Sequence, residues 1–158
     1  MVLPANIVRD HVELELDALQ GYCERHRWTL QWDPERQLLT FDRPSDLVGC
    51  AILRLTAEVE AYPLHPPAWR FWKVDGQGQA VSVFPSNRGS VGNDGSIFHP
   101  SRVICAPFNR LAYGTHQGPH PEWGMSQWKD VRGVARATTL TEMLAIITAH
   151  LKASPGVN

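Results

Sequence analysis

The sequence contains little cysteine, no long apolar run and almost no net charge. Its three cysteines, Cys23, Cys50 and Cys105, form no Cys-x-x-Cys pair. Such an odd, sparse set indicates free thiols rather than a disulfide framework. No stretch approaches the roughly 20 apolar residues that span a bilayer, and residues 1–7 lack a basic segment followed by an apolar run, so we expect no signal peptide. Together these absences predict a cytoplasmic protein that does not enter membranes.

The charge balance also excludes classes of partner. A formal net charge of -1 gives no electrostatic basis for nucleic acid or anionic lipid as the main partner. With 43% hydrophobic and 20% charged residues, the chain has the composition of a folded domain. Its 158 residues suffice for one domain with a sizeable core and are too few for two ordinary ones.

Two segments show the apolar spacing of helices. In residues 5–26, apolar side chains recur every three or four positions and share one face. These residues are Val8, Val12, Leu16, Leu19 and Cys23. Near the C-terminus, Thr139 and Glu142 match a capping box, and an apolar helical face follows from Leu140 to Leu151.

Between these segments the apolar period is two, which is typical of strands. We expect strands within 28–32, 39–41, 47–59 and 68–74, with 80–84 as a possible return arm and an ordered proline crossover before residue 68. Cys23 and Cys50 fall on packed faces. Residues 87–96 are predicted as a loop, and 106–129 as a long irregular segment of the kind that often carries function. The result is a single α+β domain, 1–158 with a core of about 5–152.

A further set of motifs follows in a fixed order along the chain. Tyr62-Pro63 leads into Pro66-Pro67 and an aromatic strand, then come His99-Pro100 and Cys105. This order, bracketed by the two helices, resembles the ubiquitin-conjugating enzymes over roughly residues 5–152. Trp128, or alternatively Trp123, resembles the tryptophan that this family has between the cysteine and the next helix.

The resemblance implies a fold and a reaction. The family has an N-terminal helix, a four-stranded antiparallel meander, an active-site loop and a helix packed behind. Cys105 is then the thiol that accepts a ubiquitin-like protein as a thioester from an activating enzyme and passes it to an amine of a target protein. The segment 5–26 is the helix that contacts the activating enzyme in that family. No cofactor and no metal are implied.

The sequence departs from the family pattern beside the cysteine. The family usually has His-Pro-Asn, whereas this chain has His99-Pro100-Ser101, and Cys105 follows His99 after only six positions. Ser101 and Asn109 are therefore candidate hydrogen-bond donors to the reacting carbonyl. For His99 we favour a ring hydrogen bond that holds the loop over direct proton transfer. The divergent triplet and short core are more similar to bacterial relatives found in ubiquitination-like antiphage defence operons.

Three alternative readings remain open at this stage. The protein could be a catalytically inactive module of the same fold that binds a ubiquitin-like protein or an activating enzyme. Cys105, His116 and His120 could bind zinc, although the sequence offers no clear fourth ligand. Finally, Cys105 could be the nucleophile of a cysteine hydrolase, with His116 or His120 as its base.

Overall fold

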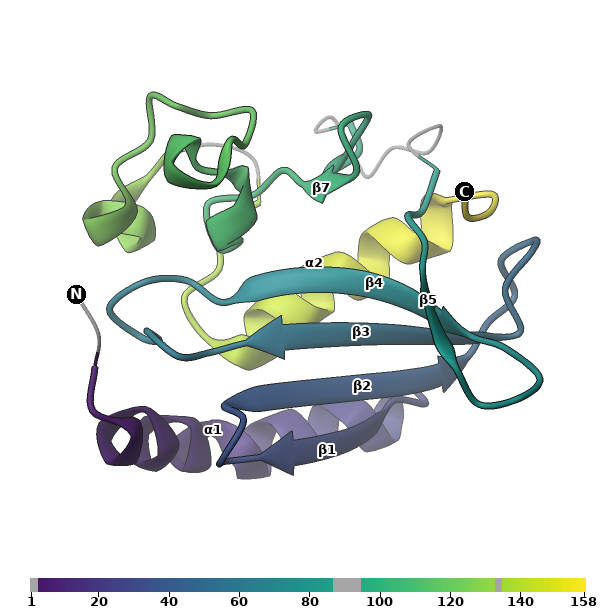
Figure 1. Ribbon diagram of the computed structural model, residues 1–158, viewed down its shortest axis with the longest axis horizontal. Helices are drawn as coiled ribbons and strands as arrows, with labels where there is room; N and C mark the ends of the chain where they lie inside the picture. The colour runs from purple at the N-terminus through teal and green to yellow at the C-terminus, as the bar shows by residue number, and fades with distance from the viewer. Residues whose placement is uncertain (1–2, 87–94, 133–134) are drawn as a thin grey trace.

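In the computed structural model, which describes residues 3–86, 95–132 and 135–158, an antiparallel sheet is flanked by two α-helices (Figure 1). The five sheet strands lie in chain order. A two-stranded hairpin and three short 3-10 helices separate them from the last helix. The elements are α1 (Ala5–Arg25), β1 (Thr29–Asp33), β2 (Leu38–Pro44), β3 (Ile52–Glu58), β4 (Ala68–Val74), β5 (Ala80–Ser82), β6 (Phe98–His99), β7 (Val103–Ile104), η1 (Arg110–Ala112), η2 (Gly114–His116), η3 (Met125–Asp130) and α2 (Leu140–Ala153).

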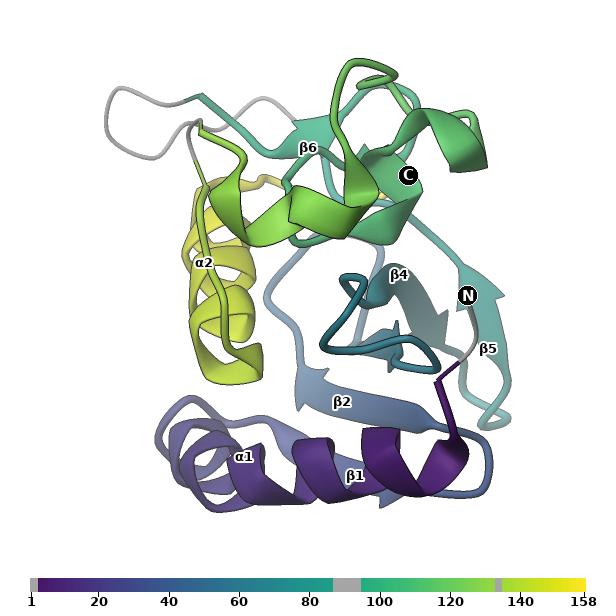
Figure 2. The ribbon, with the colours of Figure 1, turned by 90° about the vertical axis from the view of Figure 1, so that its left-hand side faces the viewer.

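The sheet buries one face because its apolar residues are in register. Phe41 pairs with Leu55, and Leu55 pairs with Phe71, so the three side chains point to the same side. All three are buried. Helices α1 and α2 cover this face together, as Figure 2 shows from the side. The opposite face is more polar and includes a two-bond ion pair between Arg54 and Asp42. This alternation of buried and polar positions is what fixes the register.

The N-terminal helix matches the sequence expectation closely. It ends at Arg25, one residue before the predicted boundary, and its apolar stripe is buried except for the partly exposed Leu16. Both helices meet at Glu15, whose carboxylate accepts hydrogen bonds from the Tyr62 hydroxyl and the Leu140 N–H. The first turn of α2 is thereby held against α1.

The sheet differs from the expected meander in two respects. It has five strands rather than four, because the return arm within 80–84 pairs with β4 as the short strand β5. The predicted strand 47–59 begins only at Ile52, since Gly49 has a φ of 84° and the preceding residues form a turn. Of the loop predicted at 87–96, residues 87–94 lie outside the described part of the chain.

The cap of α2 follows the predicted capping box with one change. The Thr139 hydroxyl accepts a hydrogen bond from Glu142 N–H at 3.2 Å. The Glu142 carboxylate reaches back one residue further than expected and accepts from Thr138 N–H at 3.0 Å. Two otherwise unpaired backbone donors are thus satisfied at the helix start.

The segment from β6 to η3 packs beside β4, where β5 leaves part of the strand edge free. Arg110 donates its backbone N–H to the Pro67 carbonyl at 2.9 Å, just before β4 begins. Trp128 in η3 donates its indole N–H to the Pro63 carbonyl at 3.1 Å. The proline crossover therefore anchors both ends of this irregular segment. Among the described residues, no helix is both long and apolar enough to cross a membrane.

Candidate active site

Cys105 lies directly after β7 at the start of the irregular segment. Its backbone N–H donates to the Ile97 carbonyl at 2.7 Å, which extends the β6–β7 pairing by one step. Its side chain is half-buried, whereas Cys23 and Cys50 are buried in the core, as expected. Burial raises the pKa of the Cys23 thiol to about 12. Cys105 is thus the only one of the three cysteines whose thiol is partly open to solvent.

The Cys105 thiol lies against a histidine fifteen residues further along the chain. Its Sγ is 2.8 Å from His120 Nε2. The other ring nitrogen, Nδ1, is 2.7 Å from the Glu122 carboxylate. A thiol, an imidazole and a carboxylate therefore form one continuous hydrogen-bonded row. This is the arrangement in which a base activates a nucleophile and a third group orients the base.

The carboxylate fixes which ring nitrogen faces the sulfur. A carboxylate only accepts hydrogen bonds, so His120 must carry a proton on Nδ1, and the neutral ring then presents the Nε2 lone pair to Cys105. The hydrogen bond from His120 lowers the pKa of Glu122 and keeps it ionised. Trp123 stacks on the His120 ring with centroids 3.7 Å apart and an interplanar angle of 2°. Stacking on Trp123 therefore fixes the plane of the imidazole ring, and the hydrogen bond to Glu122 fixes its rotation within that plane.

Two glycines allow the loop that carries His120 to fold tightly. A Cβ on Gly118 would lie 2.3 Å from the Leu111 carbonyl oxygen, and a Cβ on Gly114 would lie 2.9 Å from Pro121 Cα. Neither position has room for a side chain. This close approach lets His120 donate its backbone N–H to the carbonyl of Ala112 at 2.9 Å.

The electrostatics of the site favour a protonated thiol at rest. Burial raises the pKa of Cys105, and the negative charge of Glu122 raises it further. Since only the thiolate is a strong nucleophile, the thiol must lose its proton as it reacts. His120 Nε2 is in position to accept that proton.

The His-Pro-Ser triplet forms the turn of the β6–β7 hairpin. His99 Nδ1 lies 2.7 Å from the Ser101 hydroxyl and accepts the Ser101 backbone N–H at 3.1 Å. Arg102 N–H closes the turn on the His99 carbonyl at 2.9 Å. Within the described ranges, neither side chain of the pair forms a hydrogen bond with the Cys105 thiol. The hydrogen bonds of the His99 ring thus lie within the hairpin turn, and the loop-holding role that we favoured for it stays a prediction.

Asn109 is fully buried, and both the oxygen and the nitrogen of its side-chain amide form hydrogen bonds with the backbone. Its Oδ1 accepts from Trp69 N–H at 3.0 Å and from Leu111 N–H at 3.3 Å, while its Nδ2 donates to the Ile104 carbonyl at 2.9 Å. These bonds join β4, β7 and η1. The amide is therefore committed to holding the segment that carries Cys105, which favours a structural role over contact with a reacting carbonyl.

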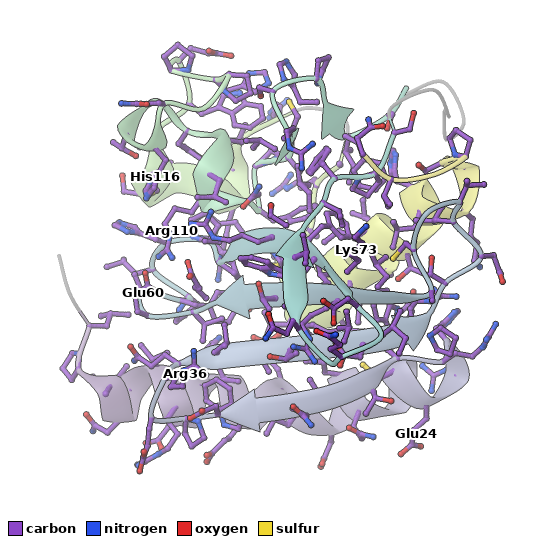
Figure 3. All side chains as sticks on the ribbon, turned by 45° about the vertical axis from the view of Figure 1, so that its right-hand side comes forward. Glu24, Arg36, Glu60, Lys73, Arg110 and His116 are labelled. Atoms are coloured by element: carbon purple, nitrogen blue, oxygen red, sulfur yellow. The ribbon has the colours of Figure 1, made fainter. Side chains whose placement is uncertain are left out.

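Among the described residues, His116, the other histidine considered as a base or ligand, forms no hydrogen bond with the Cys105 thiol. It lies near Arg110, which forms an ion pair with Glu60 at 2.7 Å (Figure 3). Burial and the positive charges of Arg110 and Arg70 lower the pKa of His116. Among the described residues, no group of three or more His, Cys, Asp or Glu side chains is arranged to hold a metal ion.

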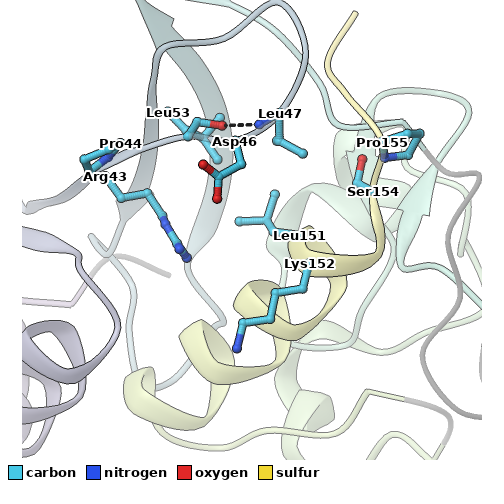
Figure 4. A pocket seen from close by; sticks show the side chains of 10 residues that line it. Arg43, Pro44, Asp46, Leu47, Leu53, Leu151, Lys152, Ser154 and Pro155 are labelled. Carbon is cyan, nitrogen blue, oxygen red and sulfur yellow. Dashed lines mark hydrogen bonds between the residues drawn. The ribbon is translucent and has the colours of Figure 1, made fainter.

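A separate pocket opens at the C-terminal end of α2 (Figure 4). It has a volume of about 410 Å³, and its lining combines leucine side chains with the charged groups of Arg43, Asp46 and Lys152. Its lining includes neither the thiol nor the residues hydrogen-bonded to it. The chemistry-bearing groups are gathered around Cys105 instead.

Sequence reasoning did not single out Glu122, and it named His120 only as one of two possible bases and as a possible zinc ligand. The contact between Cys105 and His120 depends on how the intervening loop folds, which no periodic pattern encodes. One signal was present: Gly114, Gly118 and two prolines cluster around His120, and such clusters mark tight turns.

No protein-family model matches the chain, and neither curated proteins nor solved structures gave a match.

Proposed function

We propose that the protein is an acyl transferase of the ubiquitin-conjugating type, with Cys105 as the carrier of a ubiquitin-like protein. The observation that carries this proposal is the 2.8 Å contact between the Cys105 thiol and His120 Nε2. It gives the one partly exposed cysteine a neighbouring base. The α+β layout, with a helix before and a helix after an antiparallel sheet, is compatible with the resemblance based on Tyr62, Pro63, His99 and Cys105.

The loading step is a thioester exchange. The Cys105 sulfur attacks the carbonyl carbon of the thioester on an activating enzyme, and the proton on Sγ passes to His120 Nε2. A new C–S bond forms as the old one breaks, and the departing thiolate takes up the proton from His120, which returns to its neutral form. The ubiquitin-like protein is then bound to Cys105 as a thioester, ready for transfer to an amine of a target protein. Such a thiol reacts only while it stays reduced, which agrees with a cytoplasmic site of action.

A loading assay tests the proposal. The protein is incubated with an activating enzyme, a ubiquitin-like protein and ATP, and the products are run on a gel with and without reductant. We expect an adduct that reductant removes and that Cys105→Ala abolishes. Cys105→Ser should give a more stable oxyester that survives reductant. Loading of the Cys105→Ala protein would refute the proposal.

One further function is favoured by a specific observation. The row formed by Cys105, His120 and Glu122 also suits a cysteine hydrolase, in which water rather than an amine releases the acyl group. The two activities differ in the product: a conjugating enzyme forms an amide, and a hydrolase releases a free acid.

Absence of any adduct with a demonstrably active activating enzyme would favour the non-catalytic binding module.

A further inference from the structure

We propose that His120 also serves the second half of the reaction, as the base that deprotonates the attacking amine, so that Cys105 discharges its acyl group to amines without a ligase. This inference rests on the proposed function. It assigns a base for the acceptor amine, whereas in the loading step His120 accepts the proton of the Cys105 thiol.

The position of His120 supports this role because it persists after acylation. When Sγ carries an acyl group, the thiol proton is gone, and Nε2 retains its lone pair at the side of the sulfur. The carbonyl carbon is bonded directly to Sγ, so an amine that attacks it from the side of the imidazole comes close to Nε2. The site is also open to an incoming group, since the imidazole is 28% exposed and the Glu122 carboxylate is 62% exposed.

The discharge step needs no reactant other than the acylated protein and the amine. The amine nitrogen attacks the thioester carbonyl carbon and forms a C–N bond, and its surplus proton moves to His120 Nε2. The C–S bond then breaks, and Cys105 leaves as a thiolate. The imidazolium returns its proton to that thiolate. The net products are an amide, a free Cys105 thiol and a neutral His120.

Glu122 acts through the imidazole and is a positioning residue. Its carboxylate oxygen lies 2.7 Å from His120 Nδ1 and accepts a hydrogen bond from the Nδ1–H group. Trp123 confines the ring to one plane. Without the carboxylate the ring could carry its proton on Nε2, which would leave no lone pair toward the acyl group. Removing the charge of Glu122 should therefore slow discharge without removing the base.

Discharge can be measured without any partner protein. The full chain is acetylated at Cys105 with p-nitrophenyl acetate at high pH, where the thiolate forms unaided, and excess reagent is removed. Loss of the acetyl group is then followed by intact mass at neutral pH, with and without free lysine, and acetyl-lysine is quantified. Fluorescence-monitored unfolding confirms that each variant is folded.

We expect wild-type protein to form acetyl-lysine, and His120→Gln to slow its formation on the order of 10²- to 10⁴-fold. Added imidazole should restore part of the rate in His120→Gly, which a purely structural role would not allow. Glu122→Gln should fall between wild type and His120→Gln. His116→Gln is the matched control, since it removes a histidine of the same loop that does not contact Cys105, and it should discharge like wild type.

Two results would overturn the inference: discharge to lysine at the wild-type rate in folded His120→Gln, or a wild-type acetyl-enzyme that yields acetate and no acetyl-lysine. Neither result bears on whether a ubiquitin-like protein is loaded. Conversely, a protein that transfers acetyl to lysine but accepts no ubiquitin-like protein would refute the proposed function and leave the role of His120 standing.

Discussion

Tyr113 donates its hydroxyl proton to the Pro107 carbonyl at 2.6 Å, and this bond ties the loop of Cys105 to the loop of His120. The Tyr113 backbone carbonyl accepts the Gly118 N–H at 2.9 Å, and its ring packs edge-on against Trp123 with centroids 5.5 Å apart. One buried side chain therefore touches both halves of the candidate site.

Replacing Tyr113 by phenylalanine should loosen the contact between thiol and imidazole. The change leaves the buried Pro107 carbonyl without its partner, which costs about 1–3 kcal/mol of unfolding free energy. We expect slower alkylation of Cys105 at neutral pH together with this loss, measured by iodoacetamide kinetics and urea denaturation. Tyr22→Phe in α1 is the control and should leave the alkylation rate unchanged. An unaltered rate in Tyr113→Phe would show that the two loops are aligned by other contacts.

Gly118→Ala should disrupt the site through the backbone. A Cβ there would overlap the Leu111 carbonyl, so the loop must move, and we expect a loss of about 2–4 kcal/mol in unfolding free energy. Gly76→Ala is a matched control, because a Cβ at that turn meets no atom within 4 Å. Chemical denaturation compares the two variants. Equal stability would contradict the tight packing of the loop that carries His120.

Asn109→Ala separates a structural role from a catalytic one. The variant removes three hydrogen bonds and leaves the buried Trp69 N–H unpaired, at a cost of about 1–3 kcal/mol. We expect a strong drop in stability with normal reactivity of Cys105 in the molecules that remain folded. Ser101→Ala, at the exposed hairpin turn, should change stability little. A stable Asn109→Ala protein that fails only in acyl transfer would restore Asn109 as a candidate donor.

The cysteines should differ in reactivity and in pH dependence. In native protein, iodoacetamide should modify Cys105 alone, because Cys23 and Cys50 are buried and burial raises the pKa of both thiols. Since the pKa of Cys105 is also raised, its alkylation rate should increase with pH through a midpoint above that of a free cysteine, about 8.5.

Glu122→Gln should move that midpoint to lower pH, since it removes a negative charge that raises the pKa of Cys105. Peptide mass spectrometry across a pH series measures the midpoint. Glu35→Gln, in the turn after β1, provides a charge-matched control and should not shift it. A midpoint that rises in Glu122→Gln would contradict the charge effect.

Much of the fold was predictable because its signals are local and periodic. The apolar stripe of α1 predicted a helix to within one residue, and the buried partners Trp69 and Phe71 followed from alternation. The predicted start of the third strand at residue 47 was wrong, because Gly49 adopts a left-handed backbone conformation that the pattern of side chains does not reveal. The fifth strand lies within the possible return arm at 80–84, but it has only three residues, all exposed, and is held by backbone pairing with β4.

The site was predictable only in part, for a different reason. Cys105 was singled out from its neighbours in sequence, and the structure places its thiol beside a histidine. The choice between His116 and His120 could not be made from the sequence, because both lie in an irregular loop where side-chain direction depends on individual turns. The close packing of Gly118 against Leu111 determines which histidine reaches the thiol, and this packing is a tertiary contact.

The three groups of the hydrogen-bonded row all lie within residues 105–122, while the sheet and both α-helices only support them. Chemistry and architecture nevertheless share this stretch, because Phe108, Ala112 and Tyr113 in it belong to the hydrophobic core. Exchange of the whole segment would therefore remove core packing together with the hydrogen-bonded row. Selection on this stretch acts on folding and on the row at once, so a lineage can alter the row and keep the fold only through single substitutions at its partly exposed members, such as Glu122.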